Sequence, residues 1–484
     1  MKRISNPNAG LLGVILLVAG ACELKEEPYS FLSPDQFYQT ASDAESGLTN
    51  AYANVAGLYN RVGWQLPDYS ADQMFPRAVV AREQLTVFSF DATYPLVSEY
   101  WSFCYTGLNR TNVVLERVPA IQMDPVRKRQ ILAEAYFLRA FYHFQLVKTF
   151  GEVPLKEQST KNIADAAVAP GSGKSTVDEI YQSIFRDLEI AERDLPAAPK
   201  DRGRAATGAA SALWAKAALY HGDWARASEK AQRVLQNTAY RLIPNVVDLY
   251  DPAKEDANRT EVIFAAEFSS LPNLNASDMV AFYAPANSPP LFTKTAYGSQ
   301  FGYLSFFGSF DPADKRRQLM DTAYINAAGR RIGQSDATLK DRVFVKKFLD
   351  VNSLGPNGEN NYPLLRLADV LLMAAEAEAQ ASGPNAIAYA AINRVRSRAG
   401  LPDLSPGLGK EAFVEAVLRE RSWELCFEGD RWYDLTRTGK FRTVASVTNS
   451  YYPSRPVLDK HRYFPIPNVE ILTNAALQQN PLWQ

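Results

Sequence analysis

The sequence predicts a mainly α-helical fold, in which a tetratricopeptide-like helical-repeat scaffold carries a large irregular, loop-rich subregion. Apolar residues recur at helical spacing through about 35–240 and again through about 363–440, which predicts the scaffold. This periodicity is lost between about 241 and 362, which predicts the irregular insert. Two segments, 206–236 and 364–398, place small residues nearly where a tetratricopeptide repeat needs them for close helix packing. Scaffolds of this kind present surfaces to partners.

The predicted helices follow one another along the chain. The first spans 35–61, with Ser33 as N-cap and Pro34 at the first helical position. The helix predicted at 127–150 is apolar on nearly every side, which is typical of a buried helix, and it ends before Gly151. Its His143 is therefore expected to be a core residue. The remaining predicted helices are 101–118, 176–194, 206–220, 224–236, 364–381, 384–399 and 410–428.

An aromatic-rich window lies inside the irregular insert. Residues 281–310 contain nine aromatic side chains and a single charge, Lys294, and their prolines and glycines exclude a long helix. Two interpretations stay open for these rings. They either collapse onto a core, or they form a platform on which sugar rings stack while polar side chains bind the hydroxyls.

The amino terminus resembles a bacterial lipoprotein signal peptide. Residues 11–21 form an apolar run too short to cross a bilayer, and the small residues 19–21 precede Cys22 as in a lipobox. We therefore expect a signal peptide at 1–21, lipidation of Cys22 and a mature domain at 22–484. Residues 23–27 resemble the acidic signal that sends some Gram-negative lipoproteins to the outer face of the outer membrane.

Composition excludes several functional classes. A net charge of -1 argues against a general nucleic-acid binder, which normally carries a basic surplus. Three Cys and three His exclude a disulfide scaffold and leave little for a metal site, so we expect neither metal nor cofactor. Cys104 and Cys426 are either a disulfide or two buried thiols. The segment 171–176 lacks the first glycine of a phosphate loop, so it is interpreted as a linker leading to an N-cap at Thr176.

Carboxylates are the only plentiful candidates for catalysis. One predicted helix face carries three glutamates at four-residue spacing, Glu420, Glu424 and Glu428. A glycosidase needs two carboxyl groups on either side of a cleft, and two of these glutamates could supply them. Arginines beside them favour a structural ion network instead. No other catalytic motif is recognised, and we expect no enzymatic activity.

Several segments together resemble the RagB/SusD family. The segment 419–435, Arg-Glu-Arg-Ser-Trp-Glu-Leu-Cys-Phe-Glu-Gly-Asp-Arg-Trp-Tyr-Asp-Leu, is similar to the family signature. Segments 133–155, 365–377, 392–401 and 463–481 are similar to other family motifs in the same order.

The resemblance implies a surface lipoprotein without catalytic activity. Such proteins sit as a lid on a SusC-like TonB-dependent outer-membrane transporter, capture oligosaccharides or, in some members, peptides, and assist uptake. A peptide-capturing member and a surface glycoside hydrolase are the alternatives. The resemblance also implies that Arg431 and Asp434 fix the end of the signature helix.

Family sites lie on the early loops and the irregular middle, without a residue motif. In this sequence those regions are 64–82 and the aromatic window, together with the start of the helix at 101. Aromatic rings would stack on sugars and charged groups would bind hydroxyls, so the candidate ligand residues are Trp64, Asp72, Arg82, Trp101, Tyr283 and Tyr297. For each of them an ordinary core or loop position is the simpler interpretation.

Overall fold

The computed structural model describes residues 37–77, 82–161, 173–271, 275–288 and 292–484. Cys22, the predicted signal peptide and the predicted helix start at Ser33 lie outside these residues. Within the described chain, no helix is both long and apolar enough to cross a membrane.

The first helices form an antiparallel layer around a buried helix. Helix α2 (Ala41–Asn60) begins with a capping box between Thr40 and Asp43 and packs on α5 (Pro95–Arg117), which in turn packs on α6 (Pro125–Phe150). Helix α6 is buried along most of its length, as its all-round apolar sequence predicts. His143 is fully buried there, and burial lowers the pKa of its imidazole to about 3. The core histidine is confirmed.

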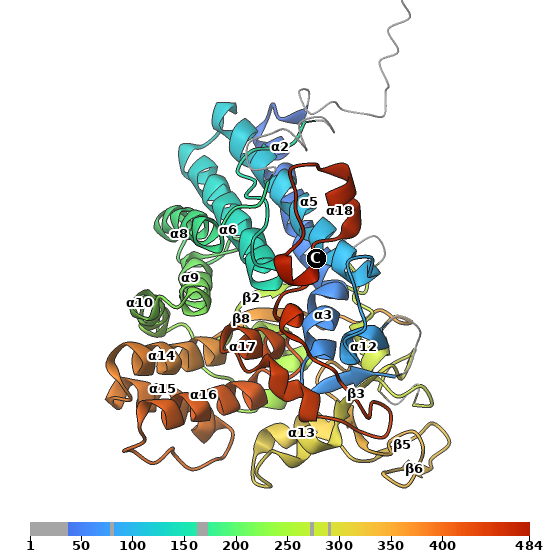
Figure 1. Cartoon of the computed structure of the whole chain (residues 1–484). Coiled ribbons are helices and arrows are strands. Elements are labelled where there is room, and N and C mark those ends of the chain that lie inside the picture. Colours follow the sequence, from blue (N-terminus) through green and yellow to red (C-terminus); the bar gives the residue numbers. More distant parts are fainter. Residues whose placement is uncertain (1–36, 78–81, 162–172, 272–274, 289–291) are drawn as a thin grey trace, which may run out of the picture.

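The remaining scaffold helices stack as hairpins. Helices α8 (Val177–Asp194), α9 (Thr207–His221) and α10 (Trp224–Leu235) lead to a second group of three, α14 (Leu367–Ser382), α15 (Ala386–Arg398) and α16 (Lys410–Glu424). The two groups meet where α10 packs on α14, as the green and orange helices of Figure 1 show. Thr176 caps α8 through a capping box with Glu179, which confirms the predicted N-cap. The helical scaffold is confirmed, whereas its tetratricopeptide-like repeat stays a prediction.

Helices α3 and α17 were absent from the prediction, and two predicted helices are shorter than expected. Helix α3 (Val62–Ser70) follows α2 after a break at Arg61 and is buried throughout, and α17 (Arg431–Arg437) follows α16. The helix predicted over 410–428 ends at Glu424 because the chain turns there, with Phe427 at a φ of 63°. Residues 364–366, predicted to begin a helix, instead complete strand β8.

The irregular insert is built from short elements. A four-stranded sheet has the order β1-β3-β7-β4, and two-stranded sheets join β2 with β8 and β5 with β6. All pairings are antiparallel: Phe75 faces Phe301, Gly302 faces Val343, Met320 faces Val345, and Ala266 faces Tyr362.

The strands are β1 (Met74–Pro76), β2 (Val262–Ala266), β3 (Gln300–Tyr303), β4 (Met320–Asp321), β5 (Tyr324–Ile325), β6 (Arg331–Ile332), β7 (Arg342–Val345) and β8 (Tyr362–Arg366). The short helices are α4 (Glu83–Thr86), α11 (Glu255–Asn258), α12 (Met279–Tyr283), α13 (Leu304–Gly308) and α18 (Asn468–Thr473). Short 3-10 turns include η2 (Val246–Tyr250) and η4 (Lys315–Leu319).

The aromatic window contributes mainly to the core. Six of its nine rings are buried, and Phe292 and Phe307 are half-buried, so the core interpretation holds for most of the window. Tyr297 is the exception, because 39% of this residue is exposed. Cys104 and Cys426 are separate buried thiols, so the disulfide alternative is excluded. Burial raises the pKa of the Cys426 thiol to about 11.

Gly107 allows α5 to approach α6 closely. A Cβ atom at this position would lie 2.3 Å from Cζ of Tyr142, a buried ring whose hydroxyl donates to the Ala51 carbonyl at 2.7 Å. We predict that Gly107→Ala lowers the free energy of unfolding by about 1–3 kcal/mol through overpacking, although alanine is the better helix former. Urea unfolding measures the change. Gly308→Ala is the matched control, because no atom lies within 4 Å of its added Cβ. Equal urea concentrations at the unfolding midpoint for Gly107→Ala and Gly308→Ala would contradict the prediction.

Candidate functional site

Three of the predicted ligand residues are buried. Trp64 on α3 and Tyr283 on α12 are 0% and 1% exposed, and their rings pack against each other with centroids 5.6 Å apart. Trp101 on α5 is 3% exposed and packs between Tyr105 and Phe150. These rings serve the core, and none of them presents a face to a ligand at the surface.

Asp72 is engaged by the signature segment. Both of its carboxylate oxygens accept hydrogen bonds from Arg431, from Nε at 2.8 Å and from Nη2 at 2.7 Å. This bidentate pair ties the loop after α3 to the start of α17. The resemblance implied that Arg431 fixes the end of the signature helix. In the structure its side chain instead joins the start of α17 to the loop after α3.

Arg82 and Tyr297 come together around Phe282. The Arg82 guanidinium lies 4.6 Å from the centre of the Phe282 ring, and the Tyr297 ring meets Phe282 edge-on at 5.3 Å. Arg61 covers the same ring at 5.5 Å and forms an ion pair with Asp278. We call these five residues the Phe282 cluster. The side chain of Arg61 is 52% exposed, so the cluster offers solvent one tyrosine ring and a guanidinium.

Three members of this cluster were not among the candidate residues: Phe282, which lies in the aromatic window, and Arg61 and Asp278, which lie outside it. Arg61 stands at the break between α2 and α3, where the predicted helix 35–61 ends, but the prediction did not include α3 directly after it. Asp278 lies three residues before the aromatic window, and its position beside that window could have marked it as a candidate residue. Their contact joins residues 217 positions apart, so only the fold brings them together.

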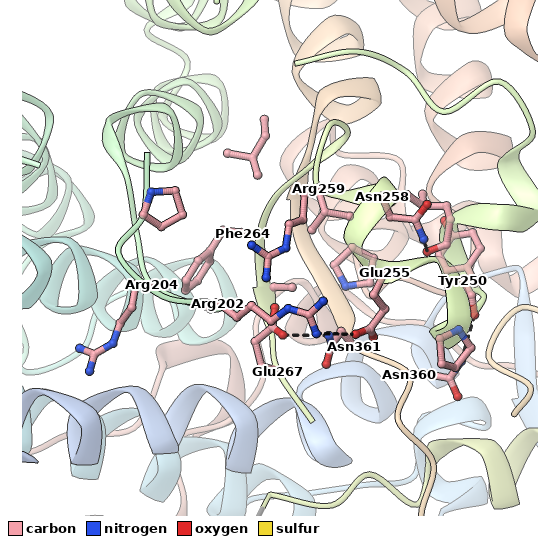
Figure 2. Close-up of a pocket in the computed structure, with 18 of the residues that line it drawn as sticks. Arg202, Arg204, Tyr250, Glu255, Asn258, Arg259, Phe264, Glu267, Asn360 and Asn361 are labelled. Atoms are coloured by element: carbon pink, nitrogen blue, oxygen red, sulfur yellow. Dashed lines mark hydrogen bonds and ion pairs between the residues drawn. The ribbon is translucent and has the colours of Figure 1, made fainter. Parts of the chain in front are cut away.

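A separate cavity lies between the scaffold and the insert (Figure 2). It measures about 290 Å³ and is bounded by the loop between α8 and α9, by η2 and α11, and by β2 with the chain that enters β8. Val262 and Phe264 supply apolar wall, and Arg202, Glu255 and Glu267 supply charge. It shares no lining residue with the Phe282 cluster.

Two of the carboxylates that line this cavity, Glu255 and Glu267, have few hydrogen-bond donors near them. Arg202 reaches Glu255 at 3.4 Å while also pairing with Asp256, and Asn361 donates to Glu267 at 2.9 Å. Figure 2 shows Arg202, Glu255, Glu267 and Asn361 close together in the middle of the view. Burial, and then the Glu267 charge, raise the pKa of Glu255 to about 7. Its Oε1 is buried and has no hydrogen-bond partner among the described residues.

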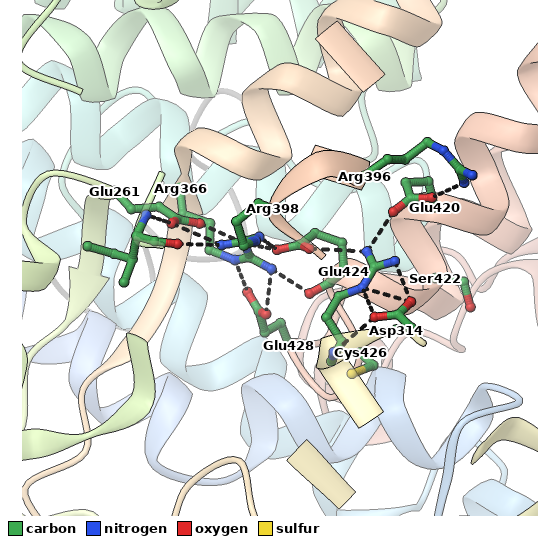
Figure 3. A network of polar contacts seen from close by, with 12 residues as sticks. Glu261, Asp314, Arg366, Arg396, Arg398, Glu420, Ser422, Glu424, Cys426 and Glu428 are labelled. Carbon is green, nitrogen blue, oxygen red and sulfur yellow. Dashed lines mark hydrogen bonds and ion pairs between the residues drawn. The ribbon is translucent and has the colours of Figure 1, made fainter. Parts of the chain in front are cut away.

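The signature glutamates belong to a buried ion network (Figure 3). Glu424 accepts from Arg366 at 2.5 Å, from Arg316 at 3.2 Å and from Arg398. Glu420 pairs with Arg316 at 2.7 Å, and Glu428 pairs with Arg366 at 2.8 Å. Burial acts to raise the pKa of Glu424, but the charges of Arg398, Arg366 and Arg316 outweigh it and hold that pKa well below its usual range. These carboxylates lie in the core and not in a cleft, as the structural interpretation expected.

Asp434 extends this arrangement to α17. It accepts from Arg421 Nε at 2.8 Å and from Arg437 Nη2 at 2.8 Å, and so fixes α17 against the end of α16. Within the part of the chain that the structure describes, no group of three or more His, Cys, Asp or Glu is arranged to hold a metal ion.

Comparison with known proteins identifies the family. The profile described as "SusD family" matches residues 260–483, and the profile described as "Starch-binding associating with outer membrane" matches residues 25–219. Between them the two profiles account for most of the chain. The chain belongs to the SusD family. The resemblance of the signature and its companion segments is thereby confirmed.

Relatives align along nearly the whole SusD-family chain. SusD-like protein P2 from Formosa agariphila is 27% identical, and the alignment covers 96% of this chain and 97% of that protein. A SusD superfamily protein from Parabacteroides distasonis is 25% identical, with a TM-score of 0.78 over 93% of this chain and 100% of that one. A SusD homolog from Bacteroides thetaiotaomicron, 24% identical, has the same fold, with a TM-score of 0.81 over 93% of this chain and 98% of that one.

Breaking the ion network should destabilise the protein strongly. We predict that Glu424→Gln, which leaves three buried arginines short of a counter-charge, lowers the free energy of unfolding by about 3–5 kcal/mol. Chemical denaturation at neutral pH measures the loss. Because the folded-state pKa of Glu424 is depressed, the difference from wild type should shrink as pH falls into strong acid. Glu411→Gln on the exposed face of the same helix is the control, with an expected change below about 0.5 kcal/mol. A neutral effect of Glu424→Gln would contradict the structural role of the network.

Proposed function

We propose that this protein is a lipid-anchored glycan-binding protein at the outer face of the outer membrane. It captures oligosaccharides and delivers them to a partner SusC-like TonB-dependent transporter, without catalysis. Membership of the SusD family supports this function, as does the family description of starch binding in association with the outer membrane. A solved neighbour titled "Laminarin binding SusD-like protein" is 25% identical, with a TM-score of 0.76 over 92% of this chain and 100% of that one.

The Phe282 cluster is the proposed capture site. Its decisive feature is the exposed Tyr297 ring, which stands beside the partly exposed guanidinium of Arg61. An aromatic face stacks on the C–H-rich face of a sugar, and guanidinium groups donate to its hydroxyls. Phe282 itself is only 4% exposed, so it positions the two arginines and Tyr297 without reaching the ligand.

The placement of the carboxylates supports binding without chemistry. The glycosidase alternative required Glu420, Glu424 or Glu428 at a cleft, and all three are buried in ion pairs. The peptide-capture alternative is compatible with the Arg61–Asp278 pair, since charged groups also bind peptide termini. The proposal favours glycans because the exposed Tyr297 ring of the cluster is an uncharged aromatic that can stack on a sugar.

Replacing Tyr297 should weaken glycan binding. We predict that Tyr297→Ala reduces the affinity for the preferred glycan at least tenfold, about 1.4 kcal/mol, because the stacking face is lost. Isothermal titration of laminarin, starch oligosaccharides and a peptide pool measures binding, and chromatography of the glycans tests for cleavage. Tyr451→Ala, at a tyrosine that is 37% exposed outside the cluster, is the matched control. Binding only to peptides, release of shortened glycans, or unchanged affinity in Tyr297→Ala would contradict the proposal.

The anchor can be tested independently of the ligand. In the proposed lipoprotein Cys22 carries the acyl chains, each buried CH₂ of which contributes about 0.8 kcal/mol to membrane binding. We predict that Cys22→Ser moves the protein from the membrane fraction to the soluble fraction of cells. Cys104→Ser and Cys426→Ser, at the two buried thiols, are the controls and should remain in the membrane fraction. Membrane retention of Cys22→Ser would contradict lipid anchoring.

A further inference from the structure

A groove lies along the outer face of α16, apart from the Phe282 cluster. It measures about 660 Å³, and its other walls are α13 and the segment that runs from α17 to residue 447. It shares no lining residue with the Phe282 cluster or with the cavity of Figure 2. A volume of this size falls within the usual range of ligand pockets, so the groove has room for a short chain of sugar rings.

Three side chains of α16 follow one another along this groove. Glu415, Arg419 and Trp423 are spaced four residues apart, which places them on one face of the helix. At one end of this row Glu415 forms an ion pair with Lys440. At the other end Nε1 of Trp423 donates to Oγ of Ser309 at 3.1 Å. The row is therefore joined to a wall of the groove at each end, and Arg419 stands between the two contacts.

Arg419 is the cation of the groove that lacks a counter-charge. It is exposed, and it forms no ion pair with any residue that the structure describes. The other charged residues of the lining are all in ion pairs: Arg431 with Asp72, Lys440 with Glu415, and Asp434 with Arg421 and Arg437. The groove thus has one guanidinium left over, and a guanidinium binds a carboxylate or a similar oxyanion through strong charge-assisted hydrogen bonds.

The rest of the groove surface suits a sugar. The Trp423 indole is half-buried, and the Phe310 ring packs against it with centroids 5.8 Å apart. Its contacts with Phe310 and Ser309 hold the ring in place, so a ligand need not order it. An indole stacks on the C–H-rich face of a sugar, and the hydroxyl groups of Ser305 and Thr443 can bind sugar hydroxyls. A ring for Trp423 and an anion for Arg419 are combined in a saccharide that carries carboxylate or sulfate groups.

We propose that the groove along α16 is a second binding site, which takes a short anionic oligosaccharide. In this site Trp423 stacks on a sugar ring, and Arg419 binds the carboxylate or sulfate group of that ring or of its neighbour. The site goes beyond the proposed capture at the Phe282 cluster, because it lies elsewhere on the molecule and selects its ligand by charge.

Titration with charged and uncharged oligosaccharides tests this site. The probes are oligogalacturonides, which carry carboxylates, and sulfated galacto-oligosaccharides, each added to the full mature chain in isothermal titration. Uncharged galacto-oligosaccharides of the same length are the comparison. We expect at least one anionic probe to bind about tenfold more tightly than the uncharged ones. Higher ionic strength should weaken this binding, since the contact with Arg419 is exposed to solvent.

Variants of Arg419 assign the binding to the groove. Arg419→Gln should weaken the binding of the anionic probe about tenfold and remove its dependence on ionic strength. Arg419→Lys, which keeps the charge, should lose less. Arg394→Gln on α15 is the matched control, because Arg394 is also exposed without an ion pair among the described residues and lies outside the groove. Circular dichroism and thermal melting confirm that each variant is folded.

The outcomes separate this proposal from the capture site. Binding of an anionic probe that Tyr297→Ala preserves and Arg419→Gln removes supports the groove, even if laminarin and starch oligosaccharides fail to bind. No binding of either anionic probe, equal binding of the uncharged ones, or binding that Arg419→Gln leaves unchanged overturns it. Loss of this binding in Tyr297→Ala but not in Arg419→Gln would assign the ligand to the Phe282 cluster and would also overturn it. A glutamate-rich peptide is the counter-probe, and tighter binding of this peptide through Arg419 would overturn the assignment to saccharides.

Discussion

The structure depends on burying the Glu424 carboxylate among three arginines. These arginines come from η4, from the end of β8 and from the end of α15, so one side chain of α16 holds the insert and the scaffold together. A buried charge is costly unless it is paired, and here each partner is itself shared: Arg366 also binds Glu428 and Glu261, and Arg316 binds Glu420. The network therefore favours a single arrangement of segments that are far apart in sequence.

This anchoring explains how short strands and loops can carry binding surfaces. Strands of two to five residues have little stability of their own, but β2 and β8 are held at their ends by Glu261 and Arg366. The cavity of Figure 2 opens beside that same pair of strands. The Phe282 cluster rests on buried rings in a similar way, since Trp64 of α3 packs against both Phe282 and Tyr283 at the end of α12. Buried side chains thus hold in place the exposed groups that are proposed to bind ligands.

Helices and caps were predictable because their signals are local. The spacing of apolar residues identified most of the scaffold, and Thr176 could be recognised as a cap from its neighbours. Helix α3 contains Pro67 and is buried on all sides, and the strands are too short to show alternation, so neither has a clear local pattern. Just after the end of α16, Phe427 adopts a left-handed conformation, which the intrinsic preference of phenylalanine does not predict.

The sequence alone determined the family signature, the helical scaffold, and the structural role of Glu420, Glu424 and Glu428, because arginines placed among apolar residues need buried partners. It also identified Arg82 and Tyr297 among its candidate residues. The tertiary structure decided which aromatic rings are exposed: Trp64, Trp101 and Tyr283 pack in the core, whereas Tyr297 reaches solvent. Composition cannot distinguish these cases, because an aromatic ring is stable both in a core and on a sugar-binding surface. Its exposure depends on which distant segments cover it, and that is a property of the fold.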